Sequence, residues 1–233
     1  MSGYMFRQRC RPQGDYRIDQ ILEFLALIQE AFQCPNLYDS NSRVVDLKKE
    51  SLLKIFEKAA KRLLPDLGAT EFFYTIAPKK RDNNTVAVEI HTGTKPGEVL
   101  IDTYNISMDN PSKLPKFDYF CKFIEIFEPF EAFVAETDNE FTLDSYNRQH
   151  DIPQFSRPAI IRGFHYLDET MAKSIGGISY CLKAPAWHVE EFCNGVLIWL
   201  VPAPFDSGNA EHLEAQKEIM DYFKMPYSKK NNS

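Results

Sequence analysis

Glycine is scarce in this chain, with 10 residues among 233, and none of them forms a phosphate-binding pattern. Neither G-x-G-x-x-G nor G-x-x-x-x-G-K-[ST] occurs, although such loops need glycine to bring the backbone close to a phosphate. The segment "GTKPGEV" (93–99) contains two glycines, but it joins two strand-like segments and is typical of a turn. The sequence therefore predicts no nucleotide-binding loop.

Metal-ligand spacings are also missing. The five cysteines are an odd number, widely spaced, and no C-x-x-C or H-E-x-x-H occurs. The five histidines are scattered along the chain, and paired spacings of cysteine and histidine are what zinc sites require. We therefore expect no metal, no cofactor and no disulfide framework, and we interpret the cysteines as reduced residues of a cytoplasmic protein.

The chain lacks a long apolar run and a basic stripe. No run approaches the ~20 residues that a membrane span needs, and the N-terminus has no apolar core of a secretory signal. The net charge is −6, and the excess of negative charge lies in residues 66–151, which hold 8 basic and 16 acidic residues. Because nucleic-acid binders present a basic surface, the sequence predicts neither a membrane nor a nucleic acid as partner.

Two kinds of hydrophobic periodicity occur along the chain. Spacing at i, i+3 and i+4 predicts helices, and alternation of apolar and polar residues predicts strands. The expected helices are 15–32, 43–64, 113–129, 168–177 and 209–223, and the expected strands are 4–11, 70–78, 85–93, 98–106, 130–137, 159–167 and 195–201. "ISYCL" (178–182) is interpreted as a further strand with an inward cysteine.

These segments predict an α+β fold in which a largely antiparallel sheet packs against several helices. No stretch rich in glycine, serine or proline marks a boundary, so we expect a single domain over residues 1–227. The basic, polar tail at 228–233 is expected to be disordered.

The acidic segment "EIFEPFEAFVAETDNEFTLD" (125–144) is the most informative polar feature. It contains no basic residue, and phenylalanines are interleaved with its carboxylates. Charge runs are usually solvated surface, but an acidic surface also steers a basic partner into place. As candidate partner-binding residues we take its seven acidic residues: Glu125, Glu128, Glu131, Glu136, Asp138, Glu140 and Asp144.

Catalytic motifs give a weaker signal than the acidic segment does. No G-x-S-x-G occurs. A hydrolase or transferase could pair Cys181 or Cys193 with His188, or Asp206 with His212. Asp206 and His212 also fit the join between the last strand and the last helix, where Asn209 is a suitable N-cap. We therefore predict no catalytic residue.

Three stretches carry a resemblance to a known family. They are "FRQRCRPQGDYRIDQILEFLALIQ", "GFHYLDETMAKSIGG" and "APAWHVEEFCNGVLIWLVPAPFDSGNAEHLEAQKEIMDYF". Together they resemble the immunity protein 52 family of bacterial polymorphic toxin systems. Two departures stand out: Asn194 lies where that family would have a second glycine, and residues 66–151 match only loosely.

The resemblance implies a cytoplasmic immunity protein without enzymatic activity. Its partner would be a cognate toxin, a basic nuclease of restriction-endonuclease-like fold delivered between bacteria, for example by type VI secretion. The acidic surface would block the active site of this toxin. Two alternatives remain open: a small enzyme that uses the cysteine–histidine pair, and an adaptor that binds another basic protein.

Overall fold

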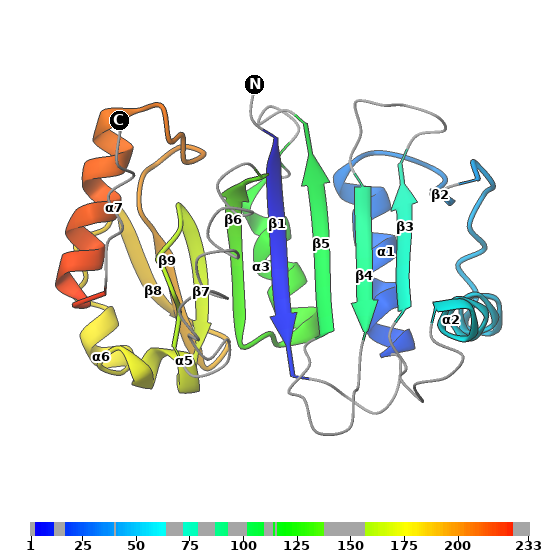
Figure 1. The fold of residues 1–233 in the computed structure, drawn as a ribbon, viewed down its shortest axis with the longest axis horizontal. Helices are drawn as coiled ribbons and strands as arrows, with labels where there is room; N and C mark the ends of the chain where they lie inside the picture. Colours follow the sequence, from blue (N-terminus) through cyan, green and yellow to red (C-terminus); the bar gives the residue numbers. More distant parts are fainter. Residues whose placement is uncertain are drawn as a thin grey trace. The chain divides into compact units, whose positions relative to one another are not determined.

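The computed structural model describes residues 3–11, 17–39, 41–63, 72–78, 87–92, 102–109, 114, 116–137 and 157–225. The chain divides into two compact units, Met1–Pro129 (unit 1) and Phe130–Ser233 (unit 2). Both consist of antiparallel strands and helices (Figure 1), so the predicted α+β class with a largely antiparallel sheet is confirmed. The prediction of a single domain over residues 1–227 stays a prediction, and its 228–233 tail lies outside the described residues.

Unit 1 contains an antiparallel sheet in the order β2-β3-β4-β5-β1. The strands expected at 70–78 and 85–93 are confirmed, and they pair antiparallel, with Phe72 opposite Thr92 and Ile76 opposite Val88. The first strand pairs with the fifth along its whole length, from Tyr4 opposite Met108 to Cys10 opposite Asp102. The strand bounds are Tyr4–Cys10 (β1), Tyr38–Asp39 (β2), Phe72–Ala77 (β3), Ala87–Thr92 (β4) and Asp102–Met108 (β5).

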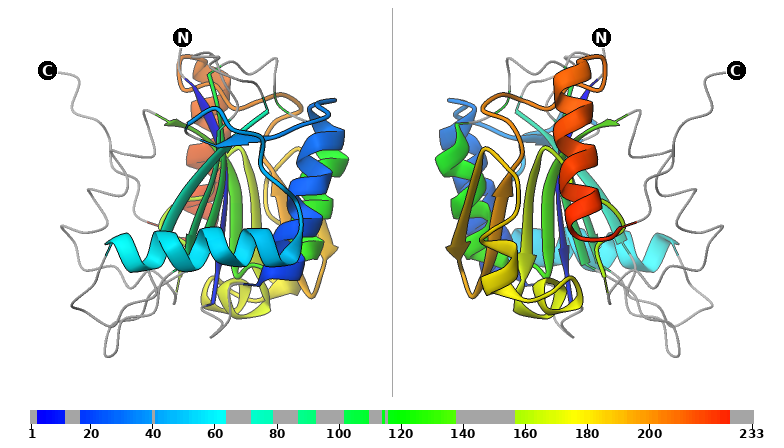
Figure 2. Two further views of the ribbon diagram at one scale, coloured as in Figure 1. Left: turned by 90° about the vertical axis from the view of Figure 1, so that its right-hand side faces the viewer. Right: turned by 90° about the vertical axis from the view of Figure 1, so that its left-hand side faces the viewer.

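The helices of unit 1 are α1 (Ile18–Ala31), α2 (Lys49–Leu63) and α3 (Phe117–Phe127). Figure 2 shows α1 and α3 side by side on one side of the unit 1 strands. The apolar stripes predicted from their spacing face one aromatic core. Its rings are in contact at centroid distances from 3.9 to 6.4 Å, and they belong to Phe6, Phe24, Tyr104, Phe120, Phe123 and Phe127.

Unit 2 has the antiparallel strand order β6-β7-β9-β8. The strands are β6 (Glu131–Glu136), β7 (Phe164–Asp168), β8 (His188–Phe192) and β9 (Gly195–Trp199). The segment "GVLIWLV" supplies β9, which is fully buried from Gly195 to Ile198 and lies between β7 and β8. The strand β8 was not expected from the sequence.

Among its described residues, unit 2 has the helices α5 (Glu169–Ser174), α6 (Ile178–Cys181) and α7 (Ala210–Tyr222). The predicted N-cap Asn209 is confirmed, because its side chain accepts a hydrogen bond from the Glu211 amide. Asp168 caps α5 in the same manner by accepting a hydrogen bond from the Met171 amide. The expected strand at 178–182 is wrong, because this segment is the short helix α6. The inward position of Cys181 is confirmed.

Candidate protein-interaction site

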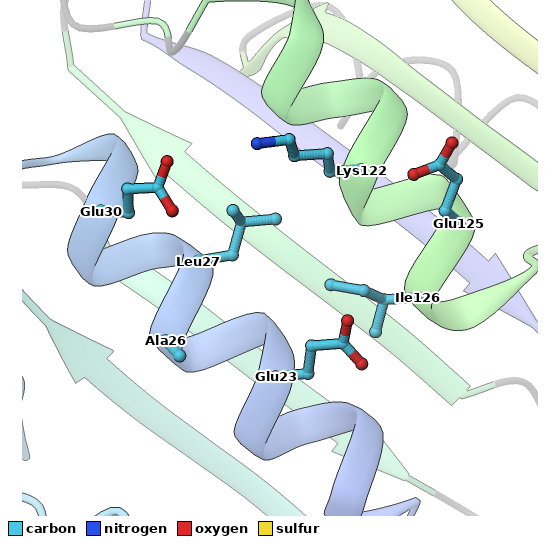
Figure 3. A pocket seen from close by; sticks show the side chains of 7 residues that line it. All are labelled: Glu23, Ala26, Leu27, Glu30, Lys122, Glu125 and Ile126. Carbon is cyan, nitrogen blue, oxygen red and sulfur yellow. The ribbon is translucent and has the colours of Figure 1, made fainter.

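A groove of about 430 Å³ lies between α1 and α3 in unit 1. The helix α1 contributes Glu23, Ala26, Leu27 and Glu30, and α3 contributes Lys122, Glu125 and Ile126 (Figure 3). The same helices turn Phe24 and Phe123 inward, with ring centroids 5.1 Å apart. The groove is therefore the solvent-facing side of a helix pair whose other side forms the aromatic core.

The groove is acidic, with an apolar floor. It is lined by three carboxylates, from Glu23, Glu30 and Glu125, and by a single ammonium group, that of Lys122. All four residues are exposed, whereas Leu27 and Ile126 are half-buried between them. Such a surface attracts a cationic group and also offers apolar area for it to cover.

Tyr119 organises one end of this groove. Its hydroxyl donates to Glu30 Oε1 at 3.1 Å, and Lys122 Nζ lies 5.3 Å from the centre of its ring. The pKa of the Tyr119 phenol is raised by desolvation first, and then by the hydrogen bond to Glu30. The phenol therefore remains a hydrogen-bond donor, and Glu30 is oriented from the other helix.

Two hydrogen bonds fix the opposite end. Gln20 Nε2 donates to the Ile126 carbonyl at 3.0 Å, and Arg17 Nη1 donates to the Phe127 carbonyl at 3.1 Å. Both carbonyls belong to the last turn of α3, where carbonyl groups lack a partner within the helix. The start of α1 thus caps the end of α3, which sets the spacing of the groove walls.

The structure places only part of the predicted acidic set on this surface. Glu125 lines the groove, and Glu128 is exposed just beyond it, with a left-handed backbone (φ 45°) that ends α3. Glu23 and Glu30 were missed by the sequence reasoning. They lie about a hundred residues before Glu125, and their only sequence signal was a position on the polar face of the first helix.

Glu131 was expected on the docking surface, and the structure corrects this: its side chain is 2% exposed. One carboxylate oxygen lies 3.0 Å from His165 Nε2 and 3.6 Å from Arg162 Nη1. The Arg162 amide donates to His165 Nδ1 at 3.1 Å, so the ring proton resides on Nε2 and points to Glu131. The Arg162 guanidinium also stacks 3.6 Å above the Phe133 ring. Glu131 is therefore part of the internal packing of unit 2.

Glu136 needs the same correction. It is 5% exposed, and both its carboxylate oxygens lie 3.3 Å from the Ser207 amide, which donates to them. The sequence could not distinguish Glu131 and Glu136 from Glu125, since burial depends on residues distant in the chain. The remaining three candidates, Asp138, Glu140 and Asp144, lie outside the described residues.

The cysteine–histidine alternative is not assembled. Cys181 is buried in α6, and burial raises the pKa of its thiol to about 11, which disfavours the reactive thiolate. His188 begins β8 and Cys193 follows its last residue, so the extended strand separates the two by about 16 Å. Neither thiol therefore has the setting of a nucleophile activated by this imidazole.

Asp206 and His212 are held together by a structural contact. The Asp206 backbone amide, and not its carboxylate, donates to His212 Nδ1 at 3.0 Å. The Asp206 carboxylate accepts from the Gly208 amide at 2.8 Å, and the Phe205 ring lies tilted against the imidazole, with the two centroids 5.7 Å apart. This geometry joins β9 to α7, as the turn and cap residues predict.

Two further searches cover only the part of the chain that the structure describes. There, no group of three or more histidine, cysteine, aspartate or glutamate residues could hold a metal ion. No helix in that part is long and apolar enough to cross a membrane.

Comparison with known proteins supplies a likeness of fold. No protein-family model matches the chain, and no curated protein matches it in sequence. Among solved structures, the chain is similar to the Pseudomonas aeruginosa T6SS protein PA0821, with a TM-score of 0.64 at 10% sequence identity. The match covers 99% of this chain and 78% of the other. At this identity the likeness establishes a shared fold.

Proposed function

We propose that this protein is an immunity protein, which binds a cognate secreted antibacterial toxin and neutralises it without enzymatic activity of its own. The toxin is a basic nuclease of restriction-endonuclease-like fold, and the acidic surface of the immunity protein covers its active site. The observation that carries the proposal is the groove between α1 and α3, which is lined by three carboxylates (Glu23, Glu30 and Glu125) and one lysine.

The chemistry of a nuclease explains why such a groove fits. A nuclease holds the phosphate backbone with lysine and arginine, so its substrate groove is basic. Carboxylates held on a rigid helix pair replace the phosphates and speed the encounter electrostatically. Once a cationic side chain has entered, Leu27 and Ile126 supply apolar area that the long aliphatic stems of arginine and lysine can cover.

Two likenesses support this proposal. The fold is shared with a protein named as a T6SS protein, which fits the delivery by type VI secretion that the family resemblance implies. The sequence stretches that resemble the immunity protein 52 family supply strands and helices of both units, among them β1, α1, β7, β9 and α7. An adaptor for another basic protein would share the acidic groove but would not protect a cell from a toxin.

The experiment that tests this function is co-expression with the product of the adjacent upstream gene. We expect that product to arrest growth when expressed alone and to be tolerated when this protein is present. Purified together, the two should form a complex whose nuclease activity is lost. A neighbouring gene product that is harmless alone, or a cell that is not rescued, would contradict the proposal.

Charge reversal then tests the groove. Glu23→Lys combined with Glu125→Lys should slow association with the toxin by ~10-fold or more and reduce the dependence of the rate on salt. The matched control is Glu50→Lys combined with Glu57→Lys, which reverses two exposed carboxylates on α2 of the same unit. Equal rates for both pairs of substitutions would place the interface elsewhere.

A further inference from the structure

The strand β8 is the last strand in the order β6-β7-β9-β8, so among the described strands it has β9 as its one neighbour. It reaches β9 through a two-residue turn at Cys193 and Asn194, whose φ values are 46° and 57°. Two left-handed residues in succession are typical of a type I′ hairpin turn. Alternate backbone N–H and C=O groups of an edge strand point away from the sheet and can pair with an added strand.

The two tryptophans of the chain lie together beside this edge. Trp187 and Trp199 are the only tryptophans in the sequence, and their rings meet edge to face at 5.1 Å. Trp199 is supported by Phe164, at 6.3 Å, whereas Trp187 is 55% exposed. Exposed tryptophans are unusual on a surface without a partner, and tryptophan is enriched at the energetic centres of interfaces.

The charges around this pair are acidic. Residues directly opposite in an antiparallel pair project from the same face, and His188 is opposite Trp199 while Glu190 is opposite Leu197. The Glu190 side chain is 43% exposed, and its Oε1 lies 3.5 Å from His188 Nε2. The next residue, Glu191, is also exposed, and the strand "HVEEF" carries no lysine or arginine.

We propose that the β8 edge is a docking site for an extended basic segment of a partner protein, which adds to unit 2 as a further strand. An arginine or lysine of this segment stacks on Trp187 and pairs with Glu190, while backbone hydrogen bonds hold the segment in register. The charge pattern selects this occupant. If a second copy of the chain paired along β8, Glu190 and Glu191 of one copy would lie against Glu190 and Glu191 of the other, and this repulsion is destabilising.

This site is independent of the acidic groove. It lies in unit 2, shares no residue with the groove of unit 1, and does not require the partner to be a toxin. Its readout is also separate, because tryptophan fluorescence arises from Trp187 and Trp199 alone. A failure of the immunity function therefore leaves the test of this site intact, and the reverse is also true.

The test is a fluorescence titration with defined peptides. The probes are a short acetylated peptide that alternates valine with arginine and its counterpart that alternates valine with glutamate. The basic peptide should give a saturable change in tryptophan emission with the intact protein, and the acidic peptide should give none. The absence of a saturable change with the basic peptide, or equal changes with both peptides, would overturn the proposal.

Two variants locate the binding. Glu190→Arg retains both tryptophans and should weaken the binding of the basic peptide at least ~5-fold. The attraction between Glu190 and a cationic side chain of the peptide is then replaced by repulsion between two cations. The matched control is Glu218→Arg, which changes an exposed carboxylate on α7 of the same unit and should leave the titration unchanged. Circular dichroism checks the fold of both. Equal binding by Glu190→Arg and the intact protein would overturn the proposal.

Discussion

The Arg17 guanidinium lies 3.5 Å from the Asp102 carboxylate, with both side chains no more than 4% exposed. The same guanidinium donates to the carbonyls of Phe127 and Arg11, at 3.1 and 2.7 Å. Arg17 therefore joins the start of α1 to β5 and to the end of α3. Because α1 and α3 form the walls of the acidic groove, this buried pair also positions the candidate site.

Arg17→Met should destabilise unit 1 strongly. The substitution removes a buried cation beside Asp102, and breaking a buried ion pair typically costs about 3–5 kcal/mol. The measurement is the free energy of unfolding in urea. The control is Lys49→Met, which removes the exposed Lys49–Asp19 pair (2.7 Å) and should cost less than about 1 kcal/mol. Similar losses for the two variants would contradict the structural role of Arg17.

Glu131→Lys should unfold the protein rather than merely alter its binding. The new ammonium would be buried against Arg162 and His165 in place of a carboxylate, at a cost on the order of 3–5 kcal/mol. Glu125→Lys, on the exposed rim of the groove, should change stability by about 0.5 kcal/mol or less. Thermal unfolding of both variants checks this difference. A Glu131→Lys protein as stable as the intact protein would contradict the buried position of Glu131 and would make it a candidate partner-binding residue again.

Gly195→Ala should destabilise the β7–β9 pairing. A Cβ atom at this position would contact the Leu167 carbonyl oxygen too closely and lie 2.9 Å from the Tyr166 hydroxyl oxygen. That hydroxyl donates to the Cys193 carbonyl at 2.7 Å, so it is not free to move. We expect a loss of about 1–3 kcal/mol, typical of overpacking. Gly208→Ala, whose Cβ would meet only Asp206 at 3.1 Å, is the milder comparison, measured by urea unfolding.

Alkaline pH should destabilise the protein through its buried thiols. Burial raises the pKa of Cys10 to about 12 and that of Cys181 to about 11, from an ordinary value of 9.0. Above pH 9 the unfolded thiols lose protons that the folded thiols retain, so the unfolding free energy falls as pH rises towards these raised values. Cys10→Ala and Cys181→Ala should each flatten this slope. The same slope in the variants would show that other groups cause it.

The sequence predicted most helices and strands because their apolar periods are regular. The stripes of 18–31 and 117–127 and the alternation in 72–77 and 87–92 specify a period without reference to the rest of the chain. The caps Asp168 and Asn209 were also readable, since a cap acts on amides two or three residues away. Local patterns therefore sufficed wherever the determining contacts are local.

The segment 178–181 shows where local patterns fail. Its isoleucine and tyrosine favour a strand, yet the Cys181 N–H donates a hydrogen bond to the Gly177 carbonyl and the segment forms α6. Tyr180 stacks on Tyr222 at 4.6 Å, and each hydroxyl donates to the carbonyl of the other residue, at 2.9 and 3.0 Å. The contact that fixes this helix comes from a residue 42 positions away.

The sequence by itself determined the fold class, the scarcity of catalytic motifs and the concentration of acidic residues in the middle of the chain. Only the tertiary structure decided which of those acidic residues face solvent. Glu125 and Glu131 are six positions apart in the same acidic run, yet one lines a groove with Glu23 and the other is buried against Arg162. The physical reason is that burial and charge pairing depend on neighbours that the fold, and not the sequence order, brings together.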